Sequence, residues 1–135
     1  MDRKSLAKRL IYLIFFIFLV NFLANKLYWY SSIWYFDMLM HTLGGFWVGL
    51  LYLYVFKPQK VSFRIVFKVI LFILAIGIGW EVFEIMVNDV IARNPFNLLD
   101  TVSDIFFDLT GGISTVVYFY KKIMFAEGSG VQLEQ

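Results

Sequence analysis

The chain has 135 residues, of which 61% are hydrophobic and 16% charged, and its formal net charge is +2. A soluble domain of this length has too little interior to bury so much apolar surface, so the composition excludes an ordinary soluble fold and indicates an all-α membrane protein. The small net charge and the placement of basic residues beside apolar segments exclude a nucleic-acid partner. The absence of cysteine excludes a disulfide framework and thiolate chemistry.

Four apolar stretches are long enough to cross a membrane, which takes about 20 mostly apolar residues. They cover residues 10–28, 36–56, 65–88 and 98–120. The basic segment 1–9 is followed by no small-residue cleavage site, so the first stretch is expected to be a retained helix and not a signal peptide. Residues 123–135 are expected to be a flexible tail or a remnant of cloning. The prediction is one transmembrane domain over residues 10–122, a four-helix bundle in the lipid bilayer; buried or re-entrant segments remain the alternative for the last two stretches.

Basic residues gather at one side of the predicted bundle. When the four helices are read in alternating directions, every lysine and arginine except Lys26 and Arg93 falls on the side that holds both termini. Because basic residues accumulate on the cytoplasmic side, the N- and C-termini are both expected to be cytoplasmic. The predicted location is the inner (cytoplasmic) membrane, as a multi-pass protein.

The acidic residues show the opposite distribution. All of them except those near the chain ends fall toward the extracytoplasmic ends of their helices, and several share a helical face with one another or with the only histidine. They are Asp37 with His41, then Glu81 with Glu84, then Asp89, and finally Asp100, Asp104 and Asp108, which form a stripe about 12 Å long. Glycines continue these faces toward the inner side, at positions that predict close helix packing: Gly45, Gly49, Gly77 and Gly112.

The negative charge of these acidic residues needs compensation, and this need suggests what the cluster of acids around His41 binds. Carboxylates in a low dielectric must be protonated or neutralised by a cation, and only Lys26 and Arg93 are nearby permanent charges. Oxygen ligands with one imidazole suit Mg²⁺, Mn²⁺, Ca²⁺, iron or zinc. The candidate metal ligands are Asp37, His41, Glu81, Glu84, Asp100, Asp104 and Asp108; the candidate catalytic residues are His41, Glu81 and Asp104. Structural alternatives are a helix cap for Asp100, a solvated loop position for Asp89 and a hydrogen-bonded core position for His41.

Three short segments resemble a known family. At Asp37-Met38-Leu39-Met40-His41, Trp80-Glu81-Val82-Phe83-Glu84 and Asp100-Thr101-Val102-Ser103-Asp104, with Asp108 and Gly111-Gly112 following, the chain resembles VanZ-like and YjdF-type small bacterial membrane proteins over residues 34–118. The resemblance implies a bacterial envelope protein of a family named for glycopeptide-antibiotic resistance. It carries no agreed reaction.

Three classes of function fit these observations. The first is a metal-dependent hydrolase or transferase that acts on a lipid-linked or phosphorylated envelope substrate, with Lys26 and Arg93 binding phosphate. The second is a proton or cation transporter, in which a homo-oligomer would widen the narrow bundle and Asp108 would act as the deep relay. The third is a membrane protein that binds a ligand in the outer cavity without turnover. The apolar inner half of the last three stretches disfavours a continuous pathway.

Overall fold

The chain folds into helices throughout the part that the computed structural model describes, which comprises residues 3–87 and 97–128. The helices are α1 (Arg3–Lys26), α2 (Trp29–Ser32), α3 (Phe36–Phe56), α4 (Phe63–Val87) and α5 (Leu98–Gly128), and these described residues include no strand. All but the short α2 contain a segment long and apolar enough to cross a membrane. The predicted all-α, four-helix membrane protein is confirmed.

Two helices extend beyond the apolar stretches that predicted them. α1 begins at Arg3 and not at residue 10, so the basic residues form its first turns. α5 continues to Gly128, so the first part of the expected tail is helical, whereas residues 129–135 lie outside the described residues. Lysine and arginine are good helix formers whose long side chains reach the membrane surface, and hydropathy alone does not detect such turns.

The turn after α3 shows how the sequence ends a spanning helix. Lys57 has a left-handed backbone conformation, with φ at 44°, and its N–H donates to the Leu53 carbonyl oxygen. Pro58 follows and cannot continue the helical hydrogen bonds. The chain therefore reverses here and returns as α4.

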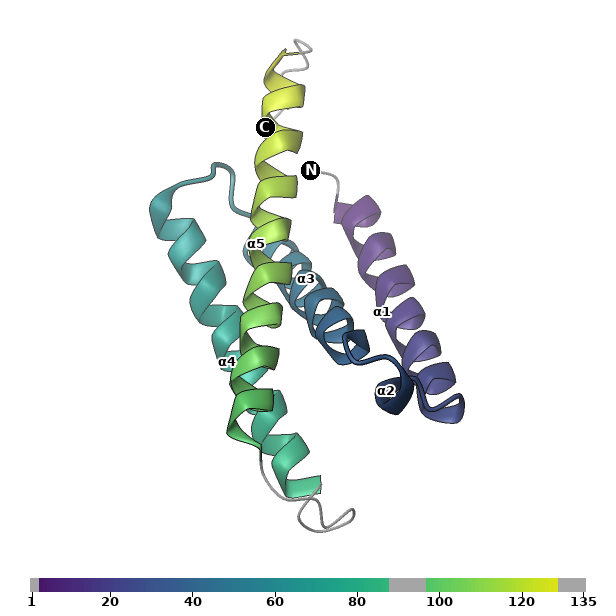
Figure 1. Ribbon diagram of the computed structural model, residues 1–135. Helices are drawn as coiled ribbons and strands as arrows, with labels where there is room; N and C mark the ends of the chain where they lie inside the picture. Colours follow the sequence, from purple (N-terminus) through teal and green to yellow (C-terminus); the bar gives the residue numbers. More distant parts are fainter. Residues whose placement is uncertain (1–2, 88–96, 129–135) are drawn as a thin grey trace.

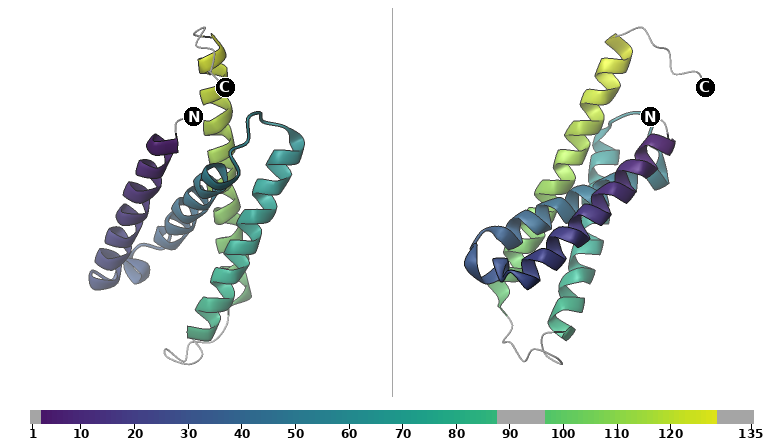
Figure 2. Two further views of the ribbon diagram at one scale, coloured as in Figure 1. Left: turned by 180° about the vertical axis from the view of Figure 1, so that it is seen from behind. Right: turned by 90° about the vertical axis from the view of Figure 1, so that its right-hand side faces the viewer.

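α3 is the central helix of the bundle. It packs against α1, α4 and α5, whereas the backbone of α1 lies beside α3 and away from α4 and α5 (Figures 1 and 2). The indole Nε1 of Trp47 joins α3 to α1 by donating to the Leu10 carbonyl oxygen at 2.9 Å. α1 begins and α5 ends at the same end of the bundle, as four membrane crossings require (Figure 1).

Glycines allow α3 and α5 to approach backbone to backbone. A methyl group on Gly45 would overlap the carbonyl oxygen of Asp108, and one on Gly111 would overlap the carbonyl oxygen of Thr42. α3 and α5 both run from the acidic end to the basic end of the bundle. This backbone contact therefore fixes the position of one helix relative to the other along the bundle axis. The expectation that small residues at helical spacing mark close packing is confirmed.

We expect Gly45→Ala to destabilise the bundle strongly. The added methyl group meets backbone that cannot move away, and overpacking of this kind costs about 1–3 kcal/mol. The free energy of unfolding in detergent should fall accordingly. Gly79→Ala is the matched control, since a methyl group there meets no atom within 4 Å and should be neutral or slightly stabilising. Equal stability of the two variants would contradict the packing described.

Candidate metal centre

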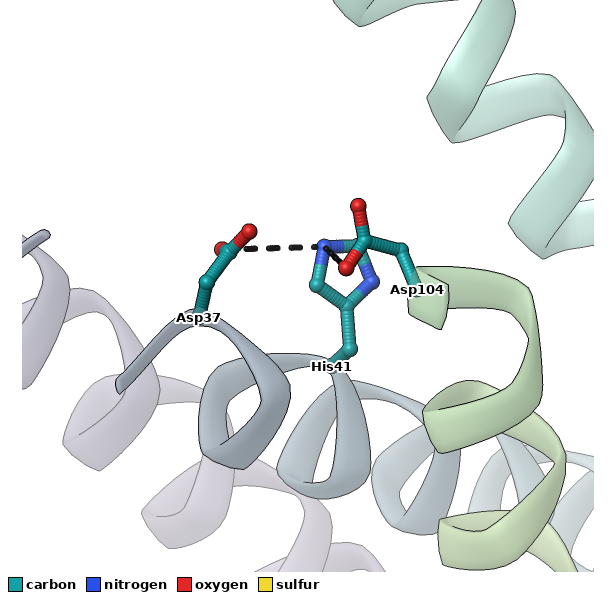
Figure 3. A group of neighbouring side chains, drawn as sticks. All are labelled: Asp37, His41 and Asp104. Atoms are coloured by element: carbon teal, nitrogen blue, oxygen red, sulfur yellow. Dashed lines mark ion pairs between the residues drawn. The ribbon is translucent and has the colours of Figure 1, made fainter. Parts of the chain in front are cut away.

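His41 lies at the meeting point of α3 and α5, one turn after Asp37 on α3. Its Nε2 is 3.8 Å from Asp37 Oδ1 and 3.8 Å from Asp104 Oδ1, and its Nδ1 is 3.3 Å from Asp108 Oδ1. Figure 3 shows the imidazole between the carboxylates of Asp37 and Asp104, each joined to it by an ion pair. His41 and Asp104 are buried, so the electrostatic interaction between them is screened less than it would be in water.

Asp108 contacts the other edge of the imidazole, in a pocket of small residues. A methyl group on Gly77 would lie 2.8 Å from Asp108 Oδ2, and one on Gly44 would lie 3.9 Å from Oδ1. The glycines of α3 and α4 therefore make room for this carboxylate deep in the bundle. Asp108 Oδ1 lies 3.3 Å from Nδ1, where it can accept a hydrogen bond from an Nδ1–H group, while Nε2 faces Asp37 and Asp104.

α4 brings two glutamates to the same histidine. One ligand atom each of His41, Glu81 and Glu84 lies within 4.8 Å of the others, and the same is true of Asp37, His41 and Asp104. Glu81 is only 5% exposed, and its Oε1 has no hydrogen-bond partner among the described residues. A buried carboxylate oxygen without a partner costs free energy, which a proton or a bound cation would offset.

Comparison with protein families identifies the chain. A family model described as predicted membrane protein (DUF2238) matches residues 2–123, which include all four spanning segments and every residue of the cluster around His41. The chain belongs to the DUF2238 family. The match supports a membrane protein family and does not extend to VanZ-like or YjdF-type proteins in particular. No curated protein and no solved structure matches this DUF2238 chain.

Two further predicted residues of this DUF2238 chain, Asp100 and Lys26, do not join the cluster. Asp100 is exposed in the first turn of α5 and belongs to neither ligand group; the helix is capped by Asn97, whose Oδ1 accepts from Leu99 N at 3.2 Å. Lys26 is exposed at the end of α1. Asp89 and Arg93 lie outside the described residues.

Tyr30 of α2 is a neighbour of the cluster that its sequence context did not reveal. Its hydroxyl donates to Asn21 Oδ1 at 2.7 Å, and its ring packs edge-on against Phe36. Burial and the nearby charges of Asp37 and Glu84 raise the pKa of Tyr30 to about 12, so the phenol is neutral at physiological pH. Aromatic residues at a span end are so common in membrane proteins that the pattern predicts only an interfacial belt.

The cluster has more negative than positive charge. Asp37, Asp104 and Asp108 all pair with the single imidazole, and no lysine or arginine among residues 3–87 and 97–128 forms an ion pair with any of them. One imidazolium cannot neutralise three carboxylates, with two glutamates close by. The arrangement therefore favours binding of protons or of a cation.

Proposed function

We propose that this chain binds a divalent metal ion between α3, α4 and α5, and that it is a membrane-embedded hydrolase or transferase acting on a lipid-linked or phosphorylated substrate. The observation that carries the proposal is the convergence of Asp37, Asp104, Glu81 and Glu84 on His41, with one buried Glu81 oxygen left without a partner. The mainly oxygen ligand set with a single imidazole fits Mg²⁺, Mn²⁺, Ca²⁺, iron or zinc.

The residues divide into ligands and a positioning residue. The ligands are expected to be Asp37, His41 through Nε2, and Asp104, while Glu81 and Glu84 of α4 form a second group that shares only His41 with them. Asp108 is expected to orient His41, in the way that a carboxylate fixes the tautomer of a metal-binding histidine. A divalent cation would supply polarisation of a phosphoryl oxygen and activation of water. The unpartnered oxygen of Glu81 would accept the proton from the attacking water or alcohol.

Close packing on the basic side of the cluster favours this reading over transport. Thr115 of α5 is fully buried and donates to the Phe46 carbonyl oxygen of α3 at 2.9 Å, and a methyl group on Gly49 would meet the Thr115 side chain. A methyl group on Gly112 would overlap Ile73 of α4. α3, α4 and α5 are thus in direct contact beyond Asp108, where a proton or cation pathway would have to pass.

A turnover assay tests the enzyme proposal. Purified protein loaded with each candidate metal should release phosphate from a lipid-linked diphosphate, and removal of the metal by a chelator should abolish the reaction. Glu81→Gln should lower kcat by about 100-fold or more, because it removes the proton acceptor, while the protein still binds metal through its other ligands. Full activity of Glu81→Gln, or turnover that survives chelation, would contradict the proposal.

The site is proposed to face the extracytoplasmic side of an inner membrane. The support is the concentration of basic residues at the opposite end of the bundle and the resemblance to VanZ-like and YjdF-type proteins of the bacterial envelope. Because the chain lacks cysteine, single cysteines can report the orientation. Ser31→Cys should react with a membrane-impermeant maleimide in intact spheroplasts, and Gln59→Cys should react only after permeabilisation. The reverse labelling pattern would show that the orientation in the membrane is opposite to the one proposed.

A further inference from the structure

A groove lies between α1, α3 and α5, toward the basic end of the bundle, and shares no residue with the ligand groups around His41. Its lining residues are Arg9, Tyr12, Leu13, Phe46, Leu50 and Tyr118. The cavity measures about 390 Å³, within the range of pockets that bind small molecules. Tyr12 at its edge is 73% exposed, so the groove opens on the surface that faces lipid.

Arg9 is the one charged residue of the groove lining. Its Nη1 donates to the Tyr118 hydroxyl, and its Cζ lies 5.7 Å from the centroid of the Tyr118 ring. No carboxylate in the described part of the chain pairs with it. A guanidinium has five N–H donors, so donors remain for an anion, and its planar fork matches phosphate oxygens.

The surroundings of the groove attract negative charge. Nine further basic residues share its end of the bundle: Arg3, Lys4, Lys8, Lys57, Lys60, Arg64, Lys68, Lys121 and Lys122. Basic pockets between spanning helices bind anionic lipid headgroups, and each nearby lysine or arginine strengthens the attraction to an anionic leaflet. The Arg9 guanidinium therefore matches the phosphate of a phospholipid, and the apolar residues of the groove lining match an acyl chain.

We propose that this groove binds one anionic phospholipid, whose phosphate pairs with Arg9 and whose acyl chain lies on Leu13, Phe46 and Leu50. A zwitterionic phospholipid has the same phosphate, but its ammonium group is repelled by the basic end of the bundle. A second copy of the chain would cover Arg9 with apolar helix surface and leave its charge uncompensated. The groove lining shares no residue with either ligand group around His41, so this inference is independent of the proposed metal chemistry.

Native mass spectrometry of the delipidated full chain tests the proposal. Titration with phosphatidylglycerol and phosphatidylcholine of the same acyl chains should show one bound lipid, with about fivefold tighter binding of phosphatidylglycerol. Arg9→Gln should remove that preference. Lys8→Gln, which removes an equal charge from the next residue but outside the groove lining, should keep most of it. Leu13→Trp should fill the groove and weaken binding of both lipids.

Four outcomes would overturn the inference. They are equal binding of the two lipids by the unmodified chain, an unchanged preference in Arg9→Gln, an equal loss of preference in Lys8→Gln, and a dimer that Leu13→Trp dissociates. Circular dichroism and size-exclusion chromatography check that each variant is folded. If Arg9→Gln does not fold, Leu13→Trp decides alone, since undiminished binding of phosphatidylglycerol would exclude the groove as its site.

Discussion

Asp104→Asn should weaken divalent-metal binding by about 100-fold or more, because it removes a buried charged ligand while keeping the shape of the side chain. The Asp104 carboxylate is 5% exposed and lies 3.8 Å from His41 Nε2, on a different helix from both His41 and Asp37. Loss of a residue that only orients a ligand already costs about 10–100-fold, so loss of a ligand should cost more. Titration of the apo protein with Mn²⁺ in detergent, followed by calorimetry or equilibrium dialysis, measures the effect.

Asp100→Asn is the control for this prediction. Asp100 stands one turn before Asp104 on α5 and has the same charge, but it is exposed and belongs to neither ligand group. Its substitution should leave metal affinity nearly unchanged. Asp104→Asn should also leave the apo protein at least as stable as before, because it relieves repulsion among the carboxylates. Equal losses of affinity in the two variants would mean that the cluster attracts metal by general charge and not by ligation.

Asp108→Asn should weaken metal binding less, by about tenfold. The asparagine oxygen can still accept from His41 Nδ1, but without the charge that holds the imidazole in one tautomer. Nitrogen-15 NMR of the only histidine gives a readout that a purely structural role would not move. The Nδ1 resonance of the unmodified apo protein should show a proton hydrogen-bonded to a carboxylate, and in the variant this resonance should shift. If Asp108 were itself a ligand, its loss would equal that of Asp104.

Metal binding should also depend on pH in a defined direction. A metal needs the neutral imidazole and ionised carboxylates, so protons compete with it at each ligand. Affinity should therefore fall as pH is lowered and rise as pH is raised toward neutrality. The same titrations measure this effect, and proton release on metal binding should accompany it.

The sequence predicted the spanning helices because length and hydropathy decide what crosses a bilayer. It also predicted that Asp37 and His41 meet, since residues four apart share a helical face. It did not predict α2, which is a single turn between two spans, or the true start of α1 at Arg3. Such short or basic turns leave no trace in the hydropathy pattern.

The spacing of residues along the chain did not predict which side chains from different helices contact each other. Asp100, Asp104 and Asp108 form one stripe in the sequence, and the stripe predicts all three as metal ligands. In the structure α3 packs tightly against α5 at Gly45, so only part of the stripe reaches the imidazole of His41. Asp104 faces Nε2, Asp108 faces Nδ1 and Asp100 is left on the exposed surface, a distinction that depends on interhelical contacts.

Pulsed electron paramagnetic resonance of the Mn²⁺-loaded protein tests the central claim most directly. His41 is the only histidine, so in a protein purified without a histidine tag a bound Mn²⁺ ion should show coupling to one imidazole nitrogen. The coupling should disappear in His41→Asn and persist in Asp100→Asn. A bound ion without nitrogen coupling, or no bound ion at all after loading, would contradict a metal centre at His41.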